Sequence, residues 1–245
     1  MADAILRLEG VSKSFGGLKV IDDVGFEVRR GSRTALIGPN GAGKTTVFNL
    51  VSGVYPTDAG ALRMEGEDIT ALPARLRISR GIARSFQNLR LMPHLSTVEN
   101  VMLGEHWRAS PLSLARGRRS ARAAEAALAD AGLGTYPGQV VSTLPYGIQK
   151  RIEVVRALLA EPRLLLLDEP AAGLNTAETD ALRALLERAS ARGITLLVVE
   201  HDMRFVRRLC DHVVVINFGR RIFEGTPDEV HRDPGVREAY LGVAA

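Results

Sequence analysis

The stretch Gly38-Pro39-Asn40-Gly41-Ala42-Gly43-Lys44-Thr45 fits the phosphate-binding loop pattern G-x-x-x-x-G-K-[ST] at every fixed position. Its glycines allow backbone N–H groups to turn toward phosphate oxygens, while the lysine adds a positive charge and the threonine hydroxyl is suited to Mg²⁺. Residues 34–37 before it are typical of a short buried strand, and residues 46–51 after it have the composition of a helix start. Strand, loop and helix in this order predict a nucleotide-binding site.

A second stretch, Leu164-Leu-Leu-Leu167-Asp168-Glu169-Pro170, is an apolar strand that ends in two carboxylates. Such runs are typical of buried parallel strands, whose carboxyl ends carry functional groups. Beside a phosphate loop, we expect Asp168 to hold Mg²⁺ directly or through water and Glu169 to orient an attacking water. Two acids at a strand end can also be solvated loop residues, but their pairing with the loop favours nucleotide hydrolysis.

Three other features have a functional and a structural interpretation. Phe15 could stack on adenine or pack in the core. His201 follows the apolar run 194–199, where it could sense a γ-phosphate or serve only the local structure. Residues 144–151 lead into a helix with apolar residues at helical spacing, and its positive N-terminus could hold an anion or simply be a buried helix start.

The order of elements predicts an α/β fold with a helical insertion. Strands are expected near residues 5–8 and 24–28, joined around Gly16-Gly17, with a short hairpin over 62–70, a helical segment over 74–80 and a strand over 82–87. No strand pattern occurs between about 90 and 160, where a capping box at Ser96–Glu99 predicts a helix through Trp107 and an alanine-rich helix covers 118–131. Further predictions are a helix from Asn175 to Arg192, a strand at 194–199, a hairpin of 213–216 with 221–224, and a terminal helix capped at 226–229.

Composition indicates a globular protein without disulfides. The chain has 245 residues, is 46% hydrophobic and has a single cysteine, Cys210, which lies in an apolar-periodic stretch and is expected to be a small buried side chain in a reducing compartment. No signal peptide or membrane-length apolar run occurs, so we expect a chain that is neither secreted nor integral to a membrane. The net charge is +4. The arginine cluster at 116–122 could face anionic lipid headgroups or nucleic acid, but a solvated helix face is the commoner explanation, and the lack of interleaved aromatic residues weakens the nucleic-acid interpretation.

The motifs in this order resemble the ATP-binding subunit of ABC transporters across essentially the whole chain. The resemblance implies a P-loop NTPase (RecA-like) core with an antiparallel β subdomain at 1–89 and 161–245, and a helical subdomain at 90–160. It implies roles for particular residues: Phe15 in adenine stacking, Gly38 to Thr45 as Walker A, Gln87 as the Q-loop glutamine, Leu164 to Asp168 as Walker B, Glu169 as catalytic base, His201 as switch histidine and Ala172 to Asn175 as D-loop.

The resemblance also implies ATP and Mg²⁺ as cofactors and a dimer that sandwiches two nucleotides. Each nucleotide would be held by the phosphate loop of one subunit and the signature of the other. The metal would be held by Thr45, Gln87 and Asp168, and the catalytic residues would be Glu169, His201 and Gln87. The nucleotide-binding residues would be Phe15, Gly38, Pro39, Asn40, Gly41, Ala42, Gly43, Lys44, Thr45 and Thr46, with the signature residues Leu144, Pro145, Tyr146, Gly147, Ile148 and Gln149.

The signature departs from the usual Leu-Ser-Gly-Gly-Gln at Pro145, which has neither the hydroxyl nor the N–H that serine would offer to a γ-phosphate. The phosphate could instead be held by Tyr146, Gly147 and the helix N-terminus, with proline pre-setting the helix start. On the first interpretation, a partner subunit with an unaltered signature would compensate, which makes a heterodimer plausible.

The finer resemblance is to the LivG-type subunit of branched-chain amino-acid importers. It rests on the phrases Phe15-Gly-Gly, Ser85-Phe-Gln, Pro170-Ala-Ala-Gly-Leu-Asn175, Glu200-His-Asp-Met203 and Ala239-Tyr-Leu-Gly242. It implies two transmembrane permease subunits, a second ATP-binding subunit, indirect cooperation with a periplasmic solute-binding protein, and a place on the cytoplasmic face of the bacterial inner membrane. Importers of urea or other amino acids and a lipopolysaccharide-export ATPase are alternatives. An ABC ATPase acting on nucleic acid or ribosomes is disfavoured because the chain has no long coiled coil and no second ATPase domain, and a phosphate-loop kinase would not need the signature segment or Glu169.

Overall fold

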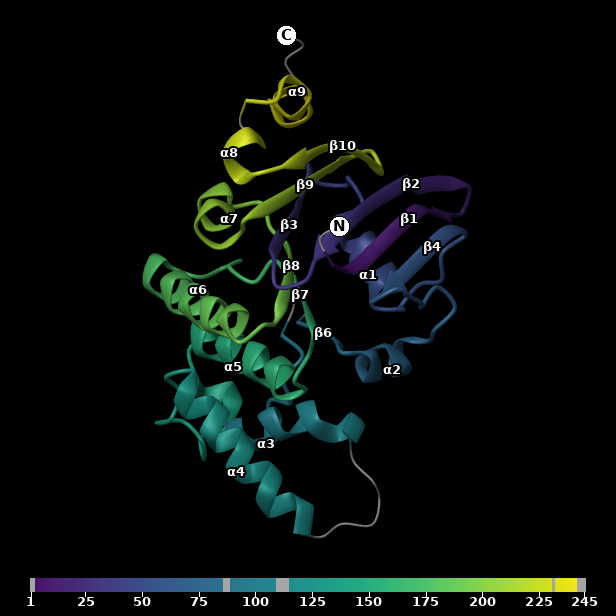
Figure 1. Cartoon of the computed structure of the whole chain (residues 1–245). Coiled ribbons are helices and arrows are strands. Elements are labelled where there is room, and N and C mark those ends of the chain that lie inside the picture. The colour runs from purple at the N-terminus through teal and green to yellow at the C-terminus, as the bar shows by residue number, and fades with distance from the viewer. Residues whose placement is uncertain (1–2, 86–88, 109–114, 231, 242–245) are drawn as a thin grey trace.

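Two sheets of different kinds organise the molecule, and Figure 1 shows them in a computed structural model that describes residues 3–85, 89–108, 115–230 and 232–241. The first sheet is antiparallel with the strand order β2-β1-β4-β5, and the second has the order β10-β9-β3-β8-β7-β6. In the second sheet, neighbouring strands are parallel except β9 and β10, which form an antiparallel hairpin. The strands are β1 (Ala4–Phe15), β2 (Leu18–Arg29), β3 (Arg33–Ile37), β4 (Ala59–Met64), β5 (Glu67–Asp68), β6 (Ile82–Arg84), β7 (Leu164–Asp168), β8 (Thr195–Val199), β9 (His212–Asn217) and β10 (Arg220–Gly225).

Most of the helices lie between β6 and β7 in sequence or cover the outer face of the second sheet (Figure 1). The described α-helices are α1 (Lys44–Val51), α2 (Ala74–Arg77), α3 (Thr97–Met102), α4 (Ala115–Asp130), α5 (Tyr146–Leu159), α6 (Thr176–Ala191), α7 (Met203–Leu209), α8 (Pro227–Val230) and α9 (Pro234–Leu241). Short 3₁₀ segments occupy Ile78–Arg80, Leu103–Arg108 and Val141–Thr143. Within the described part of the chain, no helix is both long and apolar enough to cross a membrane.

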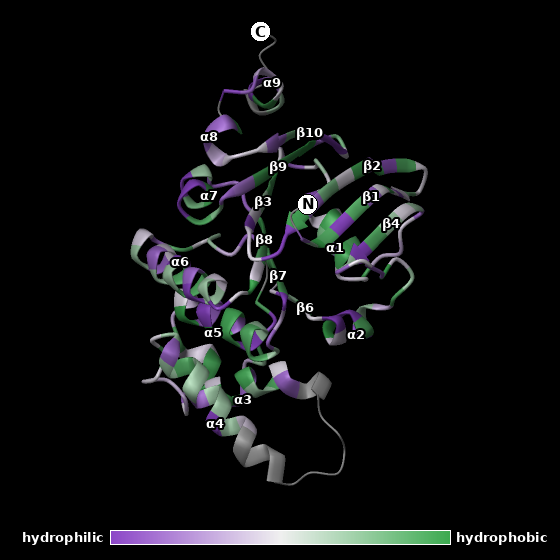
Figure 2. Ribbon diagram, viewed as in Figure 1, coloured by the Kyte–Doolittle hydropathy of each residue, from purple (hydrophilic) through white to green (hydrophobic). Residues whose placement is uncertain are grey.

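Strands β7 and β8 carry uninterrupted apolar runs, over 164–167 and 196–199, because both faces of the sheet are covered there. On one face, Leu165, Leu167 and Val198 join a core built with α5, α6 and α7. On the other face, Leu166 and Val199 join a core built with α1 and the antiparallel sheet. Figure 2 shows these central strands as hydrophobic, while the outer helices are mixed. Burial on both faces removes the period-2 alternation seen in half-exposed strands.

This layering places α1 between the two sheets, and it aligns the carboxyl ends of four parallel strands. Gly38 follows β3 directly, Asp168 is the last residue of β7, Glu200 follows β8 and Ser85 follows β6. Because β3, β8, β7 and β6 are consecutive neighbours, the polar residues that follow them gather along one edge of the sheet.

The fold class predicted from the sequence is confirmed, and a few element limits differ. The helix that begins after the Ser96 capping box is α-helical only to Met102 and then tightens into a 3₁₀ segment. The alanine-rich helix begins earlier, at Ala115. The terminal helix is split into α8 and α9.

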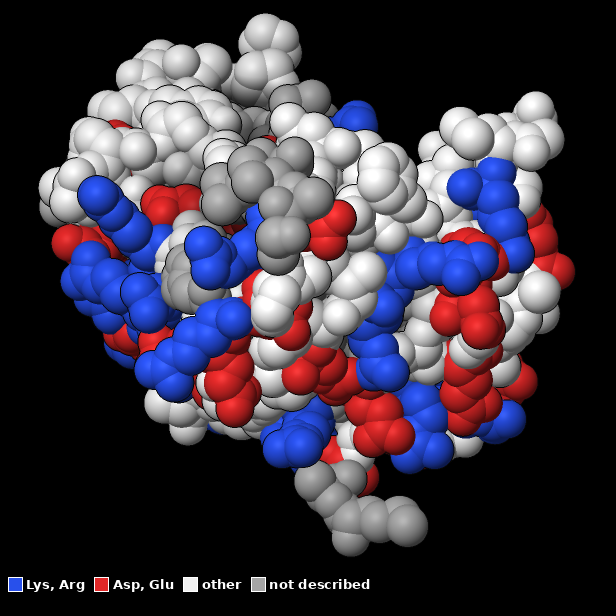
Figure 3. Space-filling model, turned by 90° about the horizontal axis from the view of Figure 1, so that it is seen from above, with Lys and Arg blue, Asp and Glu red and all other residues white. Residues whose placement is uncertain are grey.

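Surface charges are largely interspersed. Figure 3 shows basic and acidic side chains side by side on the face that it draws, in keeping with ion pairs such as Arg220 with Asp22 and Arg30 with Asp3. Arg122 of α4 is exposed, whereas the side chains of residues 116–119 lie outside the described part. The described end of the arginine cluster is thus a solvated helix surface.

Candidate functional site

The phosphate loop connects β3 to α1 in a narrow space that requires glycine. A Cβ at Gly38 would lie 2.1 Å from the carbonyl oxygen of Ile216 on β9. Gly43, with φ 102°, caps α1 without a side chain, and a Cβ there would lie 2.5 Å from the Ile21 side chain on β2. The N-terminus of α1 consequently offers its free backbone amides to whatever the loop binds.

The Lys44 side chain lies within this loop. Its Nζ donates hydrogen bonds to the carbonyl oxygens of Gly38 and Pro39 at 2.7 Å and 2.9 Å. Burial lowers the pKa of Lys44, and the negative charges of Glu169 and Asp168 oppose that shift. The lysine charge and the two carboxylates at the end of β7 therefore belong to one electrostatic site.

Asp168 is buried at the end of β7 and is held on one side only. Its Oδ2 accepts a hydrogen bond from Arg84 Nη2 at 2.7 Å, whereas its Oδ1 has no hydrogen-bond partner among the described residues. Burial raises the pKa of Asp168, and the hydrogen bond and charge of Arg84 oppose this. A buried carboxylate oxygen without a donor and the hydroxyl of Thr45, which is exposed in the first turn of α1, are both oxygen ligands of the kind that Mg²⁺ prefers.

Glu169 follows in a strained backbone conformation. Its φ is 45°, in the left-handed region that a non-glycine residue seldom adopts, and its N–H donates to the Val199 carbonyl oxygen at 2.9 Å. The turn ends the extended geometry of β7, so Glu169 does not continue the alternation in which Asp168 takes part. Such strain is typical of functional positions.

His201 lies beyond the end of β8 with 62% of its side chain exposed. The preceding residue, Glu200, was not singled out from the sequence, yet it is fully buried and accepts hydrogen bonds from the backbone N–H groups of Ala171 (2.9 Å) and His201 (3.1 Å). Burial raises the pKa of Glu200, and these amides oppose the shift. Glu200 thus joins the loop after β8 to the loop after β7. The sequence did offer a signal for Glu200, because an acidic residue at the end of an apolar run is the same pattern that pointed to Asp168.

Phe15 ends β1 and is 39% exposed. Its ring packs edge-on against Tyr55, with 5.1 Å between ring centroids, and Lys13 Nζ lies 5.5 Å from the Phe15 centroid. An exposed aromatic held by a second ring fits a flat base better than it fits a core position. Tyr55 is a second residue that the sequence did not single out.

The signature segment begins α5. Pro145 occupies the N-cap with φ −55° and ψ 148°, and its carbonyl oxygen accepts from the N–H groups of Ile148 and Gln149 at 3.0 Å and 3.1 Å. Proline therefore lies at the helix start, one residue before the first helical residue, Tyr146. The Gln149 side chain donates a hydrogen bond to the Leu144 carbonyl oxygen at 2.8 Å, so the two ends of the segment 144–149 are joined.

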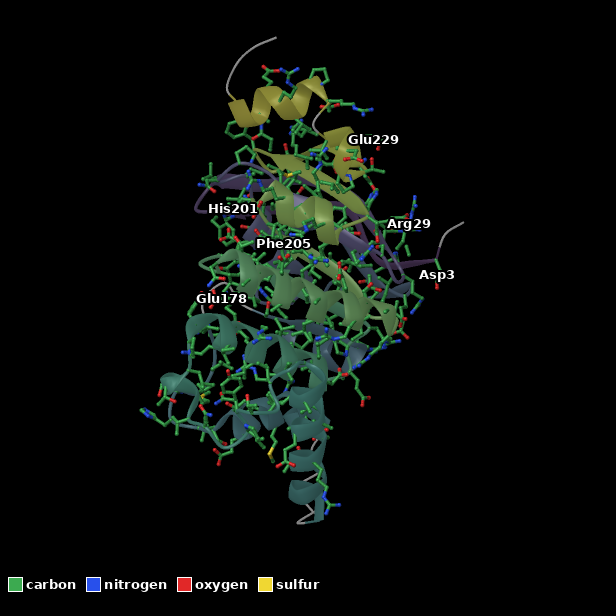
Figure 4. All side chains as sticks on the ribbon, turned by 90° about the vertical axis from the view of Figure 1, so that its left-hand side faces the viewer. Asp3, Arg29, Glu178, His201, Phe205 and Glu229 are labelled. Carbon is green, nitrogen blue, oxygen red and sulfur yellow. The ribbon has the colours of Figure 1, made fainter. Side chains whose placement is uncertain are left out.

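Gly147 of this segment is pressed against the start of α6. A Cβ there would lie 2.4 Å from Cδ of Glu178, whose carboxylate accepts from the N–H of Asn175 at 3.0 Å. Figure 4 shows Glu178 and His201 along the same edge of the molecule. Asn175 and the start of α6 are thereby packed directly beside residues 144–149 of the same chain.

The structure therefore groups most of the residues expected from the sequence in two places. Lys44, Asp168 and Glu169 share one electrostatic site with the loop 38–46, while Gly147 in the segment 144–149 packs against the start of α6. The role expected of Gln87 falls on residues 86–88, outside the described part.

A groove of about 450 Å³ lies on the other side of Arg84, between the end of α1, α2, β6 and α5. Its wall combines apolar and arginine side chains, including Val54, Arg77, Ile78, Met92, Arg156 and Ala157.

Comparison with known families identifies this arrangement. A family model described as ABC transporter matches residues 21–172, and one described as branched-chain amino acid ATP-binding cassette transporter matches residues 220–245. The chain belongs to the ABC transporter family. As an ABC cassette it is a nucleotide-binding ATPase subunit.

Relatives of this ABC cassette match it from end to end. The high-affinity branched-chain amino acid transport ATP-binding protein BraF of Pseudomonas aeruginosa is 41% identical over all of both chains, and LivG of Escherichia coli, with the same description, is 35% identical over all of both chains. The lipopolysaccharide export system ATP-binding protein LptB of Escherichia coli is 33% identical over 98% of each chain. A nucleotide-free ATP-binding cassette from an ABC transporter has a similar structure, with a TM-score of 0.88, 32% identity and coverage of 98% of this chain and all of the other.

Proposed function

We propose that this chain is the ATP-hydrolysing subunit of an ABC importer for branched-chain or other hydrophobic amino acids. The observation that carries the proposal is the combination of the C-terminal family match at 220–245 with 41% identity to BraF over the whole chain. The subunit would lie on the cytoplasmic face of the bacterial inner membrane, bound to two permease subunits and served indirectly by a periplasmic solute-binding protein.

In this proposal, the chain's own groups bind and orient Mg·ATP. Phe15 stacks on adenine, and the loop amides with Lys44 hold the phosphates, Lys44 exchanging the Gly38 and Pro39 carbonyls for phosphate oxygens. Thr45, Gln87 and Asp168 would hold Mg²⁺, which would neutralise charge on the phosphate oxygens.

Glu169 would accept a proton from the attacking water and orient it, and His201 would contact the γ-phosphate. The backbone strain at Glu169 supports this role, because strain of this kind is typical of functional positions.

A second ATP-binding subunit would complete the site. Residues 144–149 of this chain would contact the nucleotide on the partner, and the partner's signature would contact the nucleotide bound here. Because Pro145 has no hydroxyl, we favour a heterodimer in which the partner has the usual serine.

Coupling to the membrane would pass through the groove beside Arg84. It lies between the core and the helical subdomain, which we place at 90–160, so a helix from a permease seated there would move when the subdomain rotates. In sequence, Gln87 lies three residues after the end of β6, whose residues line the groove, and it would transmit nucleotide state to the groove.

Uptake measurements test the proposal. The chain is reconstituted with its genomic neighbour permeases, second ATPase and binding protein in vesicles, and ATP-dependent uptake of leucine, isoleucine, valine and urea is compared. Uptake of the branched-chain amino acids, abolished by Lys44→Ala, is expected. Urea uptake without amino-acid uptake would contradict the proposed substrate class, and ATP-driven extraction of lipopolysaccharide would reverse the direction of transport.

A further inference from the structure

A buried arginine, Arg84, connects the metal-binding end of β7 to the helix of the phosphate loop. It lies on the edge strand β6 and pairs in register with Leu166 of β7. Only 8% of its side chain is exposed, and its guanidinium group donates to Asp168 Oδ2 at 2.7 Å. None of the sequence motifs described above includes this arginine, which lies three residues before Gln87 in sequence.

The other side of the guanidinium is held by α1. Its Nη1 donates to Asn49 Oδ1 at 2.6 Å and to Ser52 Oγ at 3.1 Å, and its Cζ lies 5.7 Å from the centroid of the Phe48 ring. A planar guanidinium fixed on both arms cannot rotate independently of its partners. Arg84 therefore fixes the Asp168 carboxylate relative to the helix that begins with Lys44 and Thr45.

The carboxylate is held in a specific way. Arg84 occupies Oδ2, and Oδ1 is left without a hydrogen-bond partner in the described structure. One oxygen thus receives a strong charge-assisted hydrogen bond, while the other remains available for a cation or its water. Groups that orient a metal ligand in this manner commonly contribute 10- to 100-fold to metal affinity.

We propose that Arg84 is a positioning residue for Mg²⁺ binding, which orients Asp168 so that its Oδ1 faces the metal. The inference rests on the proposed role of Asp168. Beyond that role, it attributes part of the affinity for Mg²⁺ to an arginine on β6 and to the side chains at α1 that hold this arginine.

The test measures binding rather than turnover. A fluorescent, non-hydrolysable ATP analogue is titrated into the full-length protein in EDTA and at increasing Mg²⁺, and Mn²⁺ binding to the protein–nucleotide complex is followed by electron paramagnetic resonance. For Arg84→Met we expect about a tenfold higher half-saturating Mg²⁺ and Mn²⁺, with affinity for the analogue in EDTA changed by less than about twofold. Arg84→Lys keeps the charge but not the two-armed contact, and should be intermediate.

Two further variants keep the test decisive if Arg84→Met folds poorly. Asn49→Ala removes a partner of Arg84 but leaves Arg84 and Asp168 in place, and should raise half-saturating Mg²⁺ by a smaller factor. Arg77→Met is the matched control, because Arg77 is also a buried arginine against α1 but donates to the Leu50 and Val51 carbonyls instead of Asp168. It should lower thermal stability without changing the Mg²⁺ dependence.

The outcomes separate this inference from the proposed function. Unchanged or tighter Mg²⁺ binding in Arg84→Met, with normal Mg²⁺ dependence in the parent, would overturn the positioning role alone. An equal shift in Arg77→Met would assign the effect to general destabilisation and overturn it as well. If the parent itself bound the analogue without any response to Mg²⁺, the proposed metal site would fail together with the inference.

Discussion

Single residues at the strand ends carry most of the chemistry proposed for this protein. Asp168 and Glu169 are adjacent, yet one is a buried carboxylate paired with Arg84, and the other occupies a left-handed turn with φ 45°. Neighbouring acids can thus have different tasks because the backbone changes direction between them.

At Glu169, replacement by glutamine should separate binding from turnover. We expect Glu169→Gln to bind ATP as the parent does but to hydrolyse it about 10²- to 10⁴-fold more slowly, because the amide cannot accept the proton of the attacking water. Steady-state hydrolysis and equilibrium nucleotide binding are measured together. Glu125→Gln, an exposed position on α4, is the control, and hydrolysis by Glu169→Gln at the control's rate would remove Glu169 from this role.

At Pro145, serine should strengthen the nucleotide sandwich. The N-cap position is exposed, and a serine there would supply a hydroxyl and an N–H beside the free end of α5. A hydrogen bond to a charged acceptor contributes about 1.5 to 3 kcal/mol, so even partial recovery should tighten ATP-dependent dimerisation about tenfold. Association of Pro145→Ser with its partner subunit is measured in a Glu169→Gln background.

Pro145→Ala is the control, because it removes the proline ring and restores the N–H as Pro145→Ser does, but it adds no hydroxyl. Equal association of the serine and alanine variants would attribute any gain to the backbone. Unchanged or weaker association in Pro145→Ser would show that α5 already binds phosphate fully without a serine.

At the scale of elements, loops between strands and helices are fixed by caps and by buried side chains. Asn175 and Glu178 form a reciprocal capping box at the start of α6, as the sequence predicted. Cys210 ends α7 as a buried thiol, also as predicted. The capping box needs no distant part of the chain, whereas Cys210 is buried by the core that α7 joins.

The α6 cap should contribute measurably to stability. Asn175→Ala removes the side-chain acceptor of the Glu178 N–H and should cost about 1 kcal/mol. For a chain of this size, the melting temperature should fall by about 2–4 °C. Asn175→Asp retains an acceptor and should melt near the parent, and equal melting of all three proteins would show that the cap is redundant.

The Cys210 thiol should be unreactive in the folded protein. Burial raises its pKa from 9.0 to about 12, so at pH 8 an aromatic disulfide reagent should label it only after denaturation. The unfolded chain loses this proton near pH 9 while the folded chain retains it. The free energy of unfolding should therefore fall as pH rises from about 9 to 12, and more steeply in the parent than in Cys210→Ala. Rapid labelling of the native protein would contradict the burial of this thiol.

At the scale of the whole molecule, the two sheets enclose α1 and present the strand ends at one edge, while the signature begins a helix packed against α6. If the opposing signature comes from a second subunit, as proposed, an isolated subunit has an incomplete site.

The isolated chain should accordingly be a slow ATPase that accelerates in the complete transporter. Hydrolysis is compared for the chain alone and reconstituted with its partners. Gln87→Ala should reduce the stimulation more than it reduces nucleotide binding, and Gln139→Ala, at an exposed position, should behave as the parent. Full stimulation of Gln87→Ala would remove this segment from coupling.

The sequence by itself determined the features that depend on neighbouring residues. The phosphate-loop pattern lies within the eight consecutive residues 38–45, and the capping boxes at Ser96 and Asn175 need a partner only three residues away. Strands that are buried on both faces could also be predicted from the sequence, because such burial leaves an uninterrupted apolar run.

Only the tertiary structure decided which strand ends meet. Arg84 and Asp168 are 84 residues apart in sequence, and they pair because β6 and β7 are neighbours in the sheet. Glu200 reaches Ala171 for the same reason, since β8 lies beside β7. Such contacts follow from strand order, which the packing of the whole core selects, and no local pattern of residues encodes it.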